Sequence, residues 1–352
     1  MEKKQIVFLY SELAAYFLAC IEELLRKPDV QVHIVRWAVN KEAPFHFKFS
    51  DNLKIYNRDD YKSDESLREL VDTLNPCIIY SSGWMDKGYL KICKGYKRNI
   101  PVIVGFDNQW KGSFKQHIAT LISPFKILNH FSHCWVPGSL QVEYALRLGF
   151  KKEKIMTGFY CCDFDLFCKE YQTNKADKEQ NFPKRFIYVG RYVEHKGIKD
   201  LWRAFIELQE NTQNDWELWC IGTGDLQPVT HEKIKHFGFV QPDALPEYIK
   251  KTGVFVLPSH FEPWGVVMHE FAAAGFPIIC SDEVGARVIF AEENVNGYIY
   301  KSGDIEQLKV KLKKMMNLSN DKLLEMGNIS VEKAKAITPE IWSNMLLSLI
   351  KK

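Results

Sequence analysis

Residues 258–277 read PSHFEPWGVVMHEFAAAGFP and come directly after a short apolar run, Val254–Leu257. The helical pattern Gly265–Ala274 follows a tight loop, and a second apolar run covers Pro277–Cys280. A buried strand, a loop, a helix and another buried strand, in this order, are typical of a βαβ unit with parallel strands. This stretch therefore predicts an α/β fold.

The same alternation of short apolar runs with amphipathic segments extends through both halves of the chain. In the second half the further strand candidates are Arg185–Val189, Trp216–Ile221 and Tyr298–Tyr300. In the first half they are Gln5–Tyr10, Val30–Trp37, Cys77–Ser81, Pro101–Phe106 and His133–Pro137. Because 352 residues exceed what one hydrophobic core normally serves, we expect two doubly wound, Rossmann-like domains.

A polar interruption between the two series sets the expected domain boundaries. Residues 166–184 contain the run KEYQTNKADKEQNFPK without apolar periodicity, and we predict that they form the linker. The first domain then covers 1–165 and the second covers 185–337. A terminal helix at 338–352, with threonine as its N-cap and proline in its first turn, is expected to join the first domain.

Composition excludes several classes of protein. The chain is 46% apolar and 26% charged, and its formal net charge of +3 is too weak to indicate a nucleic-acid partner. Its nine cysteines include no C-x-x-C pair and its ten histidines show no paired metal-ligand spacing on a helix, so we expect neither a disulfide framework nor a metal site. The apolar runs near the N-terminus are too short for a signal peptide or a membrane span. We expect a cytoplasmic protein, at most peripheral on the inner face of a membrane.

The helix that begins near Gly265 offers a site for an anion. The N–H groups of Gly265, Val266 and Val267 lie at its N-terminus, where the helix dipole favours a phosphate. Glu262 precedes this end, and Glu270 follows about two turns later. Because carboxylates repel a phosphate, their partners should be neutral hydroxyls, and a nucleotide sugar offers both groups. The alternative is that Glu262 caps the helix and that Glu270 is solvated.

A second candidate for phosphate binding follows the strand at 185–189, where residues 190–197 read GRYVEHKG. Ligands of open α/β sheets bind at the carboxyl ends of strands. Gly190 permits close approach of the backbone, while Arg191 and Lys196 supply two positive charges that suit a diphosphate. The alternative is that both are ordinary solvent-exposed residues beside a turn.

Together these motifs resemble the retaining glycosyltransferases of family four, which have the GT-B architecture of two Rossmann-like domains facing across a cleft. The resemblance covers most of residues 154–305 and keeps the family's order of motifs. The motifs are the Gly-Arg and Lys-Gly pairs at 190–191 and 196–197, IGTG at 221–224, FGFV at 237–240 and the glutamates at 262 and 270.

The resemblance implies a role for each motif. Arg191 and Lys196 would bind the donor diphosphate, and Glu270 would bind the ribose hydroxyls. Glu262 would bind hydroxyls of the donor sugar, and the backbone from Gly238 to Val240 would lie beside the base. The implied donor is a UDP-sugar or a GDP-sugar, with no metal.

Two aspartate positions need separate interpretation. Asp107 follows an apolar run of the first half, near the place where family members often carry a histidine that contacts the donor sugar. We take Asp107 as a candidate polar group of the reaction site, with an ordinary turn aspartate as the alternative. Asp163 and Asp165 form an Asp-x-Asp motif, which holds a metal in a different glycosyltransferase fold, but here they resemble the interdomain segment of family four.

The sequence also departs from the family pattern. YSELAA at 10–15 replaces the usual glycine-rich loop, and the glutamate expected after Gly285-Ala286 is absent from RVIF at 287–290. These departures leave open a catalytically silent nucleotide-sugar-binding protein. A dinucleotide-dependent oxidoreductase ranks below it, because no G-x-G-x-x-G follows the first strand.

We therefore predict a retaining, hexosyl-transferring enzyme whose acceptor is a saccharide or lipid-linked saccharide of cell-envelope polysaccharide assembly. The segment 84–131 indicates a membrane contact, because it holds eight Lys or Arg against two Asp, together with several aromatic residues. Such a mixture suits anionic lipid headgroups, and we assign Lys87, Lys91, Lys94 and Lys97 to this basic face. A solvated basic helix over buried aromatic residues is the alternative.

Overall fold

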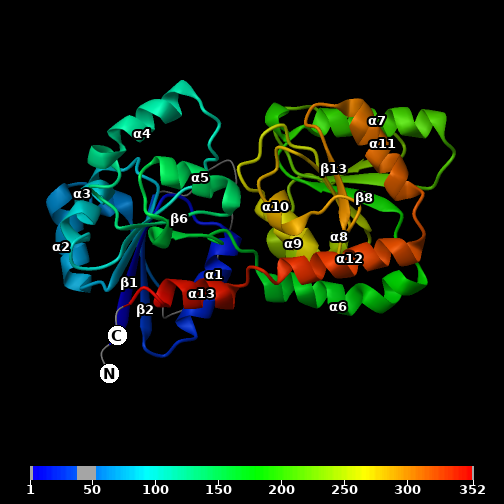
Figure 1. Cartoon of the computed structure of the whole chain (residues 1–352). Helices are drawn as coiled ribbons and strands as arrows, with labels where there is room; N and C mark the ends of the chain where they lie inside the picture. The colour runs from blue at the N-terminus through cyan, green and yellow to red at the C-terminus, as the bar shows by residue number, and fades with distance from the viewer. Residues whose placement is uncertain (1–2, 38–52, 351–352) are drawn as a thin grey trace. The chain divides into compact units, whose positions relative to one another are not determined.

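The computed structural model describes residues 3–37 and 53–350, and its chain divides into two compact units. Unit 1 comprises Met1–Cys161 and Ile337–Lys352, and unit 2 comprises Cys162–Ala336. Each unit holds one parallel β-sheet with helices packed around it (Figure 1). The prediction of two parallel-sheet α/β domains is therefore confirmed.

Within its described residues, the sheet of unit 1 has seven strands in the order β3-β2-β1-β4-β5-β6-β7. The strands are β1 (Lys4–Tyr10), β2 (Val30–Arg36), β3 (Leu53–Asn57), β4 (Ile78–Ser82), β5 (Val102–Gly105), β6 (His133–Trp135) and β7 (Ile155–Met156). The helices are α1 (Ala15–Leu25), α2 (Asp64–Leu74), α3 (Lys87–Tyr96), α4 (Phe114–Lys126), α5 (Ser139–Arg147) and α13 (Pro339–Leu347). The interior strand β1 reads KQIVFLY and is buried from Ile6 onward, as a parallel strand covered on both faces requires.

The C-terminal helix α13 packs against α1 of unit 1. Thr338 caps it by accepting a backbone hydrogen bond, and Pro339 occupies its first turn. Trp342 is buried, and its Nε1 donates to the carbonyl oxygen of Phe159 at 2.9 Å. Its ring also stacks on Trp135, with the ring centroids 4.7 Å apart. These contacts attach the C-terminal helix to unit 1, which is otherwise formed by the N-terminal part of the chain.

Unit 2 is described throughout, and its sheet has six strands in the order β10-β9-β8-β11-β12-β13. The strands are β8 (Arg185–Val189), β9 (Glu217–Ile221), β10 (Ile234–His236), β11 (Val254–Leu257), β12 (Ile278–Ser281) and β13 (Gly297–Tyr300). The helices are α6 (Phe164–Gln180), α7 (Ile198–Asn211), α8 (Pro246–Ile249), α9 (Val266–Ala273), α10 (Arg287–Phe290), α11 (Ile305–Met316) and α12 (Asn320–Ala334). Among all described helices of the chain, none is both long and apolar enough to cross a membrane.

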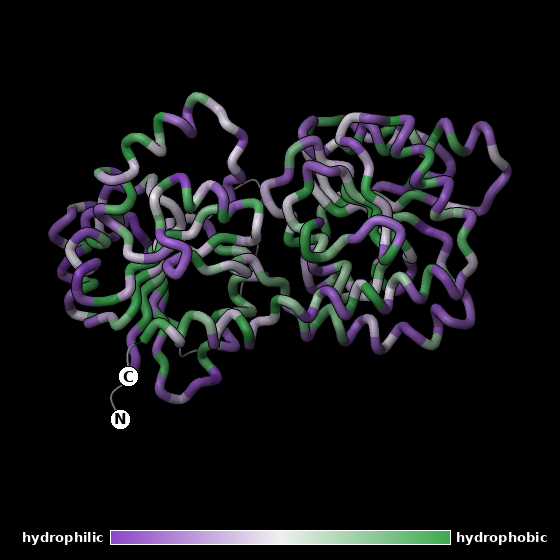
Figure 2. Tube along the Cα trace, viewed as in Figure 1, coloured by the Kyte–Doolittle hydropathy of each residue, from purple (hydrophilic) through white to green (hydrophobic). Residues whose placement is uncertain are grey.

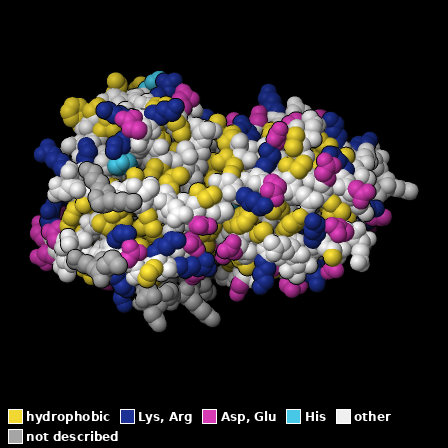
Figure 3. All heavy atoms as spheres, turned by 60° about the horizontal axis from the view of Figure 1, so that its bottom comes forward, with side chains coloured by type: hydrophobic (Ala, Val, Ile, Leu, Met, Phe, Trp, Pro, Cys, Tyr) yellow, Lys and Arg dark blue, Asp and Glu magenta, His cyan; other side chains and the backbone are white. Residues whose placement is uncertain are grey.

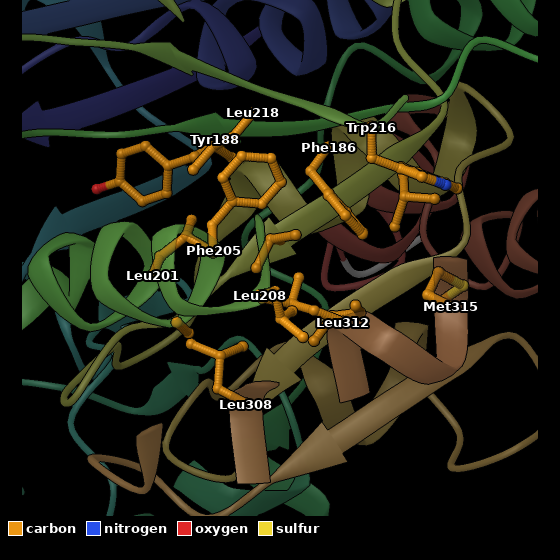
Figure 4. Packing of buried hydrophobic residues seen from close by; sticks show 14 of the residues in the cluster. Phe186, Tyr188, Leu201, Phe205, Leu208, Trp216, Leu218, Leu308, Leu312 and Met315 are labelled. Carbon is orange, nitrogen blue, oxygen red and sulfur yellow. The ribbon is translucent and has the colours of Figure 1, made fainter. Parts of the chain in front are cut away.

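The core of unit 2 packs α7 and α11 onto the sheet (Figure 4). The buried face of α7 includes Leu201, Phe205 and Leu208, whose spacing of three or four residues lines one side of a helix. Phe186 of β8 stacks on Trp216, with ring centroids 4.6 Å apart. Figure 2 shows the strands as hydrophobic segments at the centre of each unit. Burial of these apolar side chains is the main force that orders the sheet and the loops at its edge.

The structure corrects the prediction of a linker at 166–184. Most of this stretch lies in α6, which belongs to unit 2 and packs against α9 and α12. The buried residues of α6 are Phe167, Asn174 and Lys178. Asn174 donates to the carbonyl oxygen of Glu170 at 2.8 Å, and Lys178 Nζ lies 4.0 Å from the centroid of the Phe276 ring. Because two of its three buried side chains are polar, the helix shows no hydrophobic periodicity in the sequence.

Candidate active site

The loops that follow β8, β9 and β10 lie side by side at the carboxyl edge of the sheet in unit 2. The backbone N–H of Gly190 donates to the carbonyl oxygen of Ile221 at 3.0 Å. The N–H of Gly222 donates to the carbonyl oxygen of Gly238 at 2.7 Å. The motifs predicted to hold a donor therefore share one edge, where ligands of open α/β sheets bind.

The loop after β11 is held against the loop after β8. The carbonyl oxygen of His195 accepts hydrogen bonds from the backbone N–H groups of His260 at 2.9 Å and Phe261 at 3.2 Å. Gly197 has a φ of 66°, and a Cβ atom there would lie 2.0 Å from the carbonyl oxygen of Pro258. Only glycine satisfies both conditions, so this residue allows the two loops to touch.

Lys196 and Glu262 form an ion pair between these two loops. Lys196 Nζ lies 2.5 Å from Glu262 Oε2, and only 17% and 12% of the two side chains are exposed. In such a partly buried setting each charge depends on the other, because removing one partner leaves an uncompensated charge. The two residues predicted to bind different parts of the donor are thus also partners of each other.

Positive charge gathers around His195 in the loop after β8. Burial and the positive charges of Lys196 and Arg191 lower the pKa of His195. Arg191 is exposed, and its carbonyl oxygen accepts a hydrogen bond from the Tyr188 hydroxyl at 2.9 Å. A neutral imidazole beside two cations, one of them paired with Glu262, suits the binding of a diphosphate.

Helix α9 begins beside this charge with a glycine at its N-terminus. Gly265 is its N-cap with a φ of 94°, and it has no side chain that could cap this end. Its first-turn N–H groups, which include those of Val266 and Val267, are thereby directed toward an anion site. Gly265 and not Glu262 occupies the N-cap position, and the Glu262 carboxylate pairs with Lys196 instead.

Glu270 lies on α9 in a desolvated environment. Burial, with a smaller contribution from the negative charge of Asp163, raises the pKa of Glu270 to about 7. This finding contradicts the alternative in which Glu270 is an ordinary solvated carboxylate. Asp163 is the N-cap of α6 and accepts a hydrogen bond from the backbone N–H of Leu166 at 3.2 Å. The Asp-x-Asp sequence therefore starts a helix.

The loop after β10 carries the residues predicted to lie beside the base. Gly238 is bonded to the neighbouring loop through its carbonyl oxygen, and Val240 is half-buried. Phe239, between them, is 42% exposed. An exposed aromatic side chain at the edge of an anion site provides an apolar surface for the flat ring of a base.

Asp107 follows β5 and belongs to unit 1, whereas the other ten candidate residues belong to unit 2. Its backbone carbonyl accepts a hydrogen bond from Gln141 Nε2 at 3.2 Å. Its carboxylate accepts a hydrogen bond from the Tyr160 hydroxyl at 3.3 Å. The carboxylate is therefore oriented by the neighbouring Tyr160 side chain.

One polar contact at the edge of unit 2 was not predicted from the sequence. Asp200, in the first turn of α7, lies 2.6 Å from His260 Nε2 through its Oδ2. The contact holds the loop two residues before Glu262. No spacing rule could have found it, because the two residues are 60 positions apart in the chain.

Comparison with known proteins assigns a family. Residues 171–331 match the family model described as Glycosyl transferases group 1. The chain is 32% identical over 293 residues to the Bacillus subtilis protein provisionally named teichuronic acid biosynthesis glycosyltransferase TuaC, covering 77% of this chain and 70% of that relative. It is 33% identical over 127 residues to the uncharacterized glycosyltransferase MJ1607 of Methanocaldococcus jannaschii, covering 34% of this chain. It is 25% identical over 198 residues to the lipopolysaccharide 1,6-galactosyltransferase of Escherichia coli, covering 52% of this chain.

The chain spans 32% of the length of the M. jannaschii relative and 54% of that of the E. coli relative. Solved structures agree on the fold. The Anabaena protein HepE, in complex with UDP and glucose, has a TM-score of 0.68 at 13% identity, with 98% of each chain covered. A glycosyltransferase of Rickettsia africae has a TM-score of 0.73 at 12% identity, covering all of this chain and 98% of that one. The chain therefore belongs to the glycosyl transferases group 1 family, and its two parallel-sheet α/β units have the GT-B fold.

Proposed function

We propose that this chain is a retaining glycosyltransferase of family four that transfers a hexose from a UDP-sugar or GDP-sugar to a saccharide or lipid-linked saccharide. The observation that carries the proposal is the Lys196–Glu262 ion pair beside the N-terminus of α9, where the N-cap is Gly265. A cation, a carboxylate and backbone donors at one edge of a sheet fit a ligand that has both phosphates and sugar hydroxyls.

In the proposed reaction, the bond between the donor sugar and its diphosphate breaks, and negative charge builds on the departing diphosphate. Lys196, Arg191 and the first-turn N–H groups of α9 would stabilise that charge, which lowers the barrier. As Lys196 turns toward the phosphates, Glu262 loses its cation and accepts hydrogen bonds from hydroxyls of the sugar. Glu270 in its ionised form accepts hydrogen bonds from the ribose.

Retention of configuration is proposed from the resemblance to family four. The acceptor hydroxyl forms the new bond to the sugar, and its proton passes to the leaving phosphate, so no protein base is required. Asp107 of unit 1 is proposed as a contact to the donor sugar, because its carboxylate is already oriented by Tyr160.

The acceptor is proposed to be a saccharide of the cell envelope. This part of the proposal is supported by the relatives named for lipopolysaccharide and teichuronic acid, and the nucleotide sugar by the solved relative that holds UDP and glucose. All nine cysteines lie within the described residues and are free thiols, which suits the reducing cytoplasm. We propose that transfer takes place at the cytoplasmic face of a membrane, with unit 1 in peripheral contact.

The test is a panel of UDP-sugars and GDP-sugars, each compared with its nucleoside diphosphate, in which thermal stabilisation and donor hydrolysis are both measured. One sugar nucleotide should stabilise the protein more than the bare nucleotide and should be hydrolysed slowly without an acceptor. Stabilisation without hydrolysis, or without transfer to envelope saccharides, would favour the silent nucleotide-sugar-binding protein. No stabilisation by any member of the panel would refute the proposed donor site.

A further inference from the structure

Helix α4 of unit 1 faces inward with its polar side. Ser123 is buried, and its Oγ donates to the carbonyl oxygen of Leu148 at 2.5 Å. Gln116 is half-buried, and its Nε2 donates to the carbonyl oxygen of Gln109 at 2.6 Å. Ala119, between them, packs on the core of the unit. The side chains at 116, 119 and 123 share one side of a helix, so this side contacts the body of unit 1.

The opposite side of α4 is apolar and exposed. Its five large apolar side chains and their exposed fractions are Phe114 at 80%, Ile118 at 42%, Leu121 at 77%, Ile122 at 43% and Phe125 at 77%. Their spacing of three or four residues places them on one face of the helix. Figure 2 shows hydrophobic segments along α4, the helix that Figure 1 draws at the edge of unit 1. A continuous apolar face of this kind on a protein surface marks an interaction site.

The exposure of this face does not come from a frayed helix. Ser113 and Gln116 form a complete capping box at the N-terminus of α4. The ring of His117 packs edge-on against Trp110, with the centroids 5.0 Å apart. At the other end, Ile127 is buried in the core. The unit therefore holds the apolar face outward on a helix fixed at both ends.

The stretch of chain that contains α4 carries charge of one sign. Residues 108–142 include no Asp or Glu, although 44 acidic residues among 352 amount to one in eight, which would place about four in a stretch of this length. The same stretch holds Lys111, Lys115 and Lys126, all exposed. Figure 3, by contrast, shows a face on which acidic and basic side chains are intermixed. An exposed apolar stripe bordered by lysines, in a stretch of chain without acidic residues, is complementary to an apolar layer with an anionic surface.

We propose that α4 inserts its apolar face into an anionic lipid bilayer and so holds unit 1 at the membrane surface. A second copy of the chain is a poorer occupant, because its lysines would be brought against the same lysines. Lysines at the border of the face can keep their ammonium groups among lipid headgroups while their alkyl stems cover apolar surface. The proposal deepens the proposed function, and it rests on that function only for the choice of a bilayer that carries the acceptor.

Within the segment 84–131, which contains both α3 and α4, the structure favours α4 as the membrane contact. Among the lysines that the sequence assigned to a basic face, Lys91 forms an ion pair with Asp64, and Lys97 donates to the carbonyl oxygen of Leu128. Both contacts engage the ammonium groups of these two lysines and so weaken their attraction to anionic lipid headgroups. Insertion through α4 predicts binding that salt weakens but does not abolish, because only its electrostatic part is screened.

The test is co-sedimentation of the full chain with vesicles of phosphatidylcholine and phosphatidylglycerol in equal parts, and with vesicles of phosphatidylcholine alone. The variant carries Phe114→Gln, Leu121→Gln and Phe125→Gln. Its matched control carries three glutamines at other half-exposed apolar positions, namely Leu146→Gln, Val310→Gln and Ile341→Gln. The α4 variant should lose at least about tenfold in partitioning to the anionic vesicles, the scale of withdrawing several large apolar groups from a bilayer, while the control stays close to the wild type.

Three results would overturn the proposal: no binding of the wild type at low salt, equal binding of the α4 variant, or a wild-type dimer that the variant turns into a monomer without any lipid binding. The last result would assign the face to a second copy. Donor binding, measured without vesicles, should be the same in the wild type and the α4 variant. If the wild type binds the vesicles but no donor, the proposed function alone is refuted. If the wild type binds a donor but not the vesicles, only the role of α4 is refuted.

Discussion

Replacing Lys196 by alanine should affect stability and transfer to different and separable extents. The pair with Glu262 is 17% and 12% exposed, so its loss should lie between that of a buried pair, about 3–5 kcal/mol, and that of a surface pair, about 0–1 kcal/mol. We expect Lys196→Ala to destabilise unit 2 by roughly 2 kcal/mol, which lowers its unfolding midpoint by roughly 4–8 °C. Turnover should fall at least about a hundredfold, the scale of losing one group aimed at developing charge.

A second substitution separates the two effects. Adding Glu262→Gln to Lys196→Ala removes the unpaired carboxylate, and should restore most of the unfolding midpoint but none of the turnover. Lys199→Ala is the control. Lys199 lies three residues further along the chain and pairs with Glu194, but 54% and 70% of these two side chains are exposed. It should change the midpoint and donor hydrolysis very little. Near-normal turnover of Lys196→Ala, or recovery of turnover in the double variant, would refute the assignment of Lys196 to the diphosphate.

Three further predictions concern unit 2. Because the pKa of Glu270 is raised to about 7, the folded state holds the proton of its carboxyl group more tightly than the unfolded chain does. The stability of the wild type therefore falls as pH rises from about 4.5 to 7. Glu270→Gln should raise the unfolding midpoint at about pH 8 but not at about pH 4. Burial lowers the pKa of Lys178 to about 7, so the stability of the wild type rises with pH from about 7 toward 10.5. In denaturant titrations, Lys178→Met should be more stable than the wild type by ~1 kcal/mol or more at about pH 6. Its advantage should be smaller at about pH 9. An advantage that grew with pH would contradict this sign. Gly197→Ala should weaken donor binding at least about tenfold in calorimetry, because its Cβ would lie 2.0 Å from the carbonyl oxygen of Pro258. Gly303→Ala is the control and should leave donor binding unchanged. Gly303 also has a positive φ, of 76°, but no described atom lies within 4 Å of the added Cβ.

The strands that the sequence predicted lie inside their sheets, apart from β13 at one end of the sheet of unit 2. β8 and β11 have the predicted bounds, because a parallel strand buried on both faces reads as a continuous apolar run. The strands that were missed, β3, β7 and β10, all stand at the ends of their sheets. An edge strand has fewer neighbours and needs fewer apolar residues, so LKIYN, IM and IKH leave little trace in hydropathy. α6 was missed for a related reason, since polar side chains occupy its buried face.

The sequence by itself determined which loops line the carboxyl edge of unit 2, because parallel strands all end at the same edge of their sheet. Only the tertiary structure decided how the side chains in those loops are used. It pairs Lys196 with Glu262 across 66 positions of chain and desolvates Glu270 near Asp163, and both effects depend on distances between loops that periodicity does not encode. Helix α4 shows the same division. Its sequence has one polar and one apolar side, and only the structure shows that the polar side, with Ser123 bonded to the backbone of unit 1, faces inward.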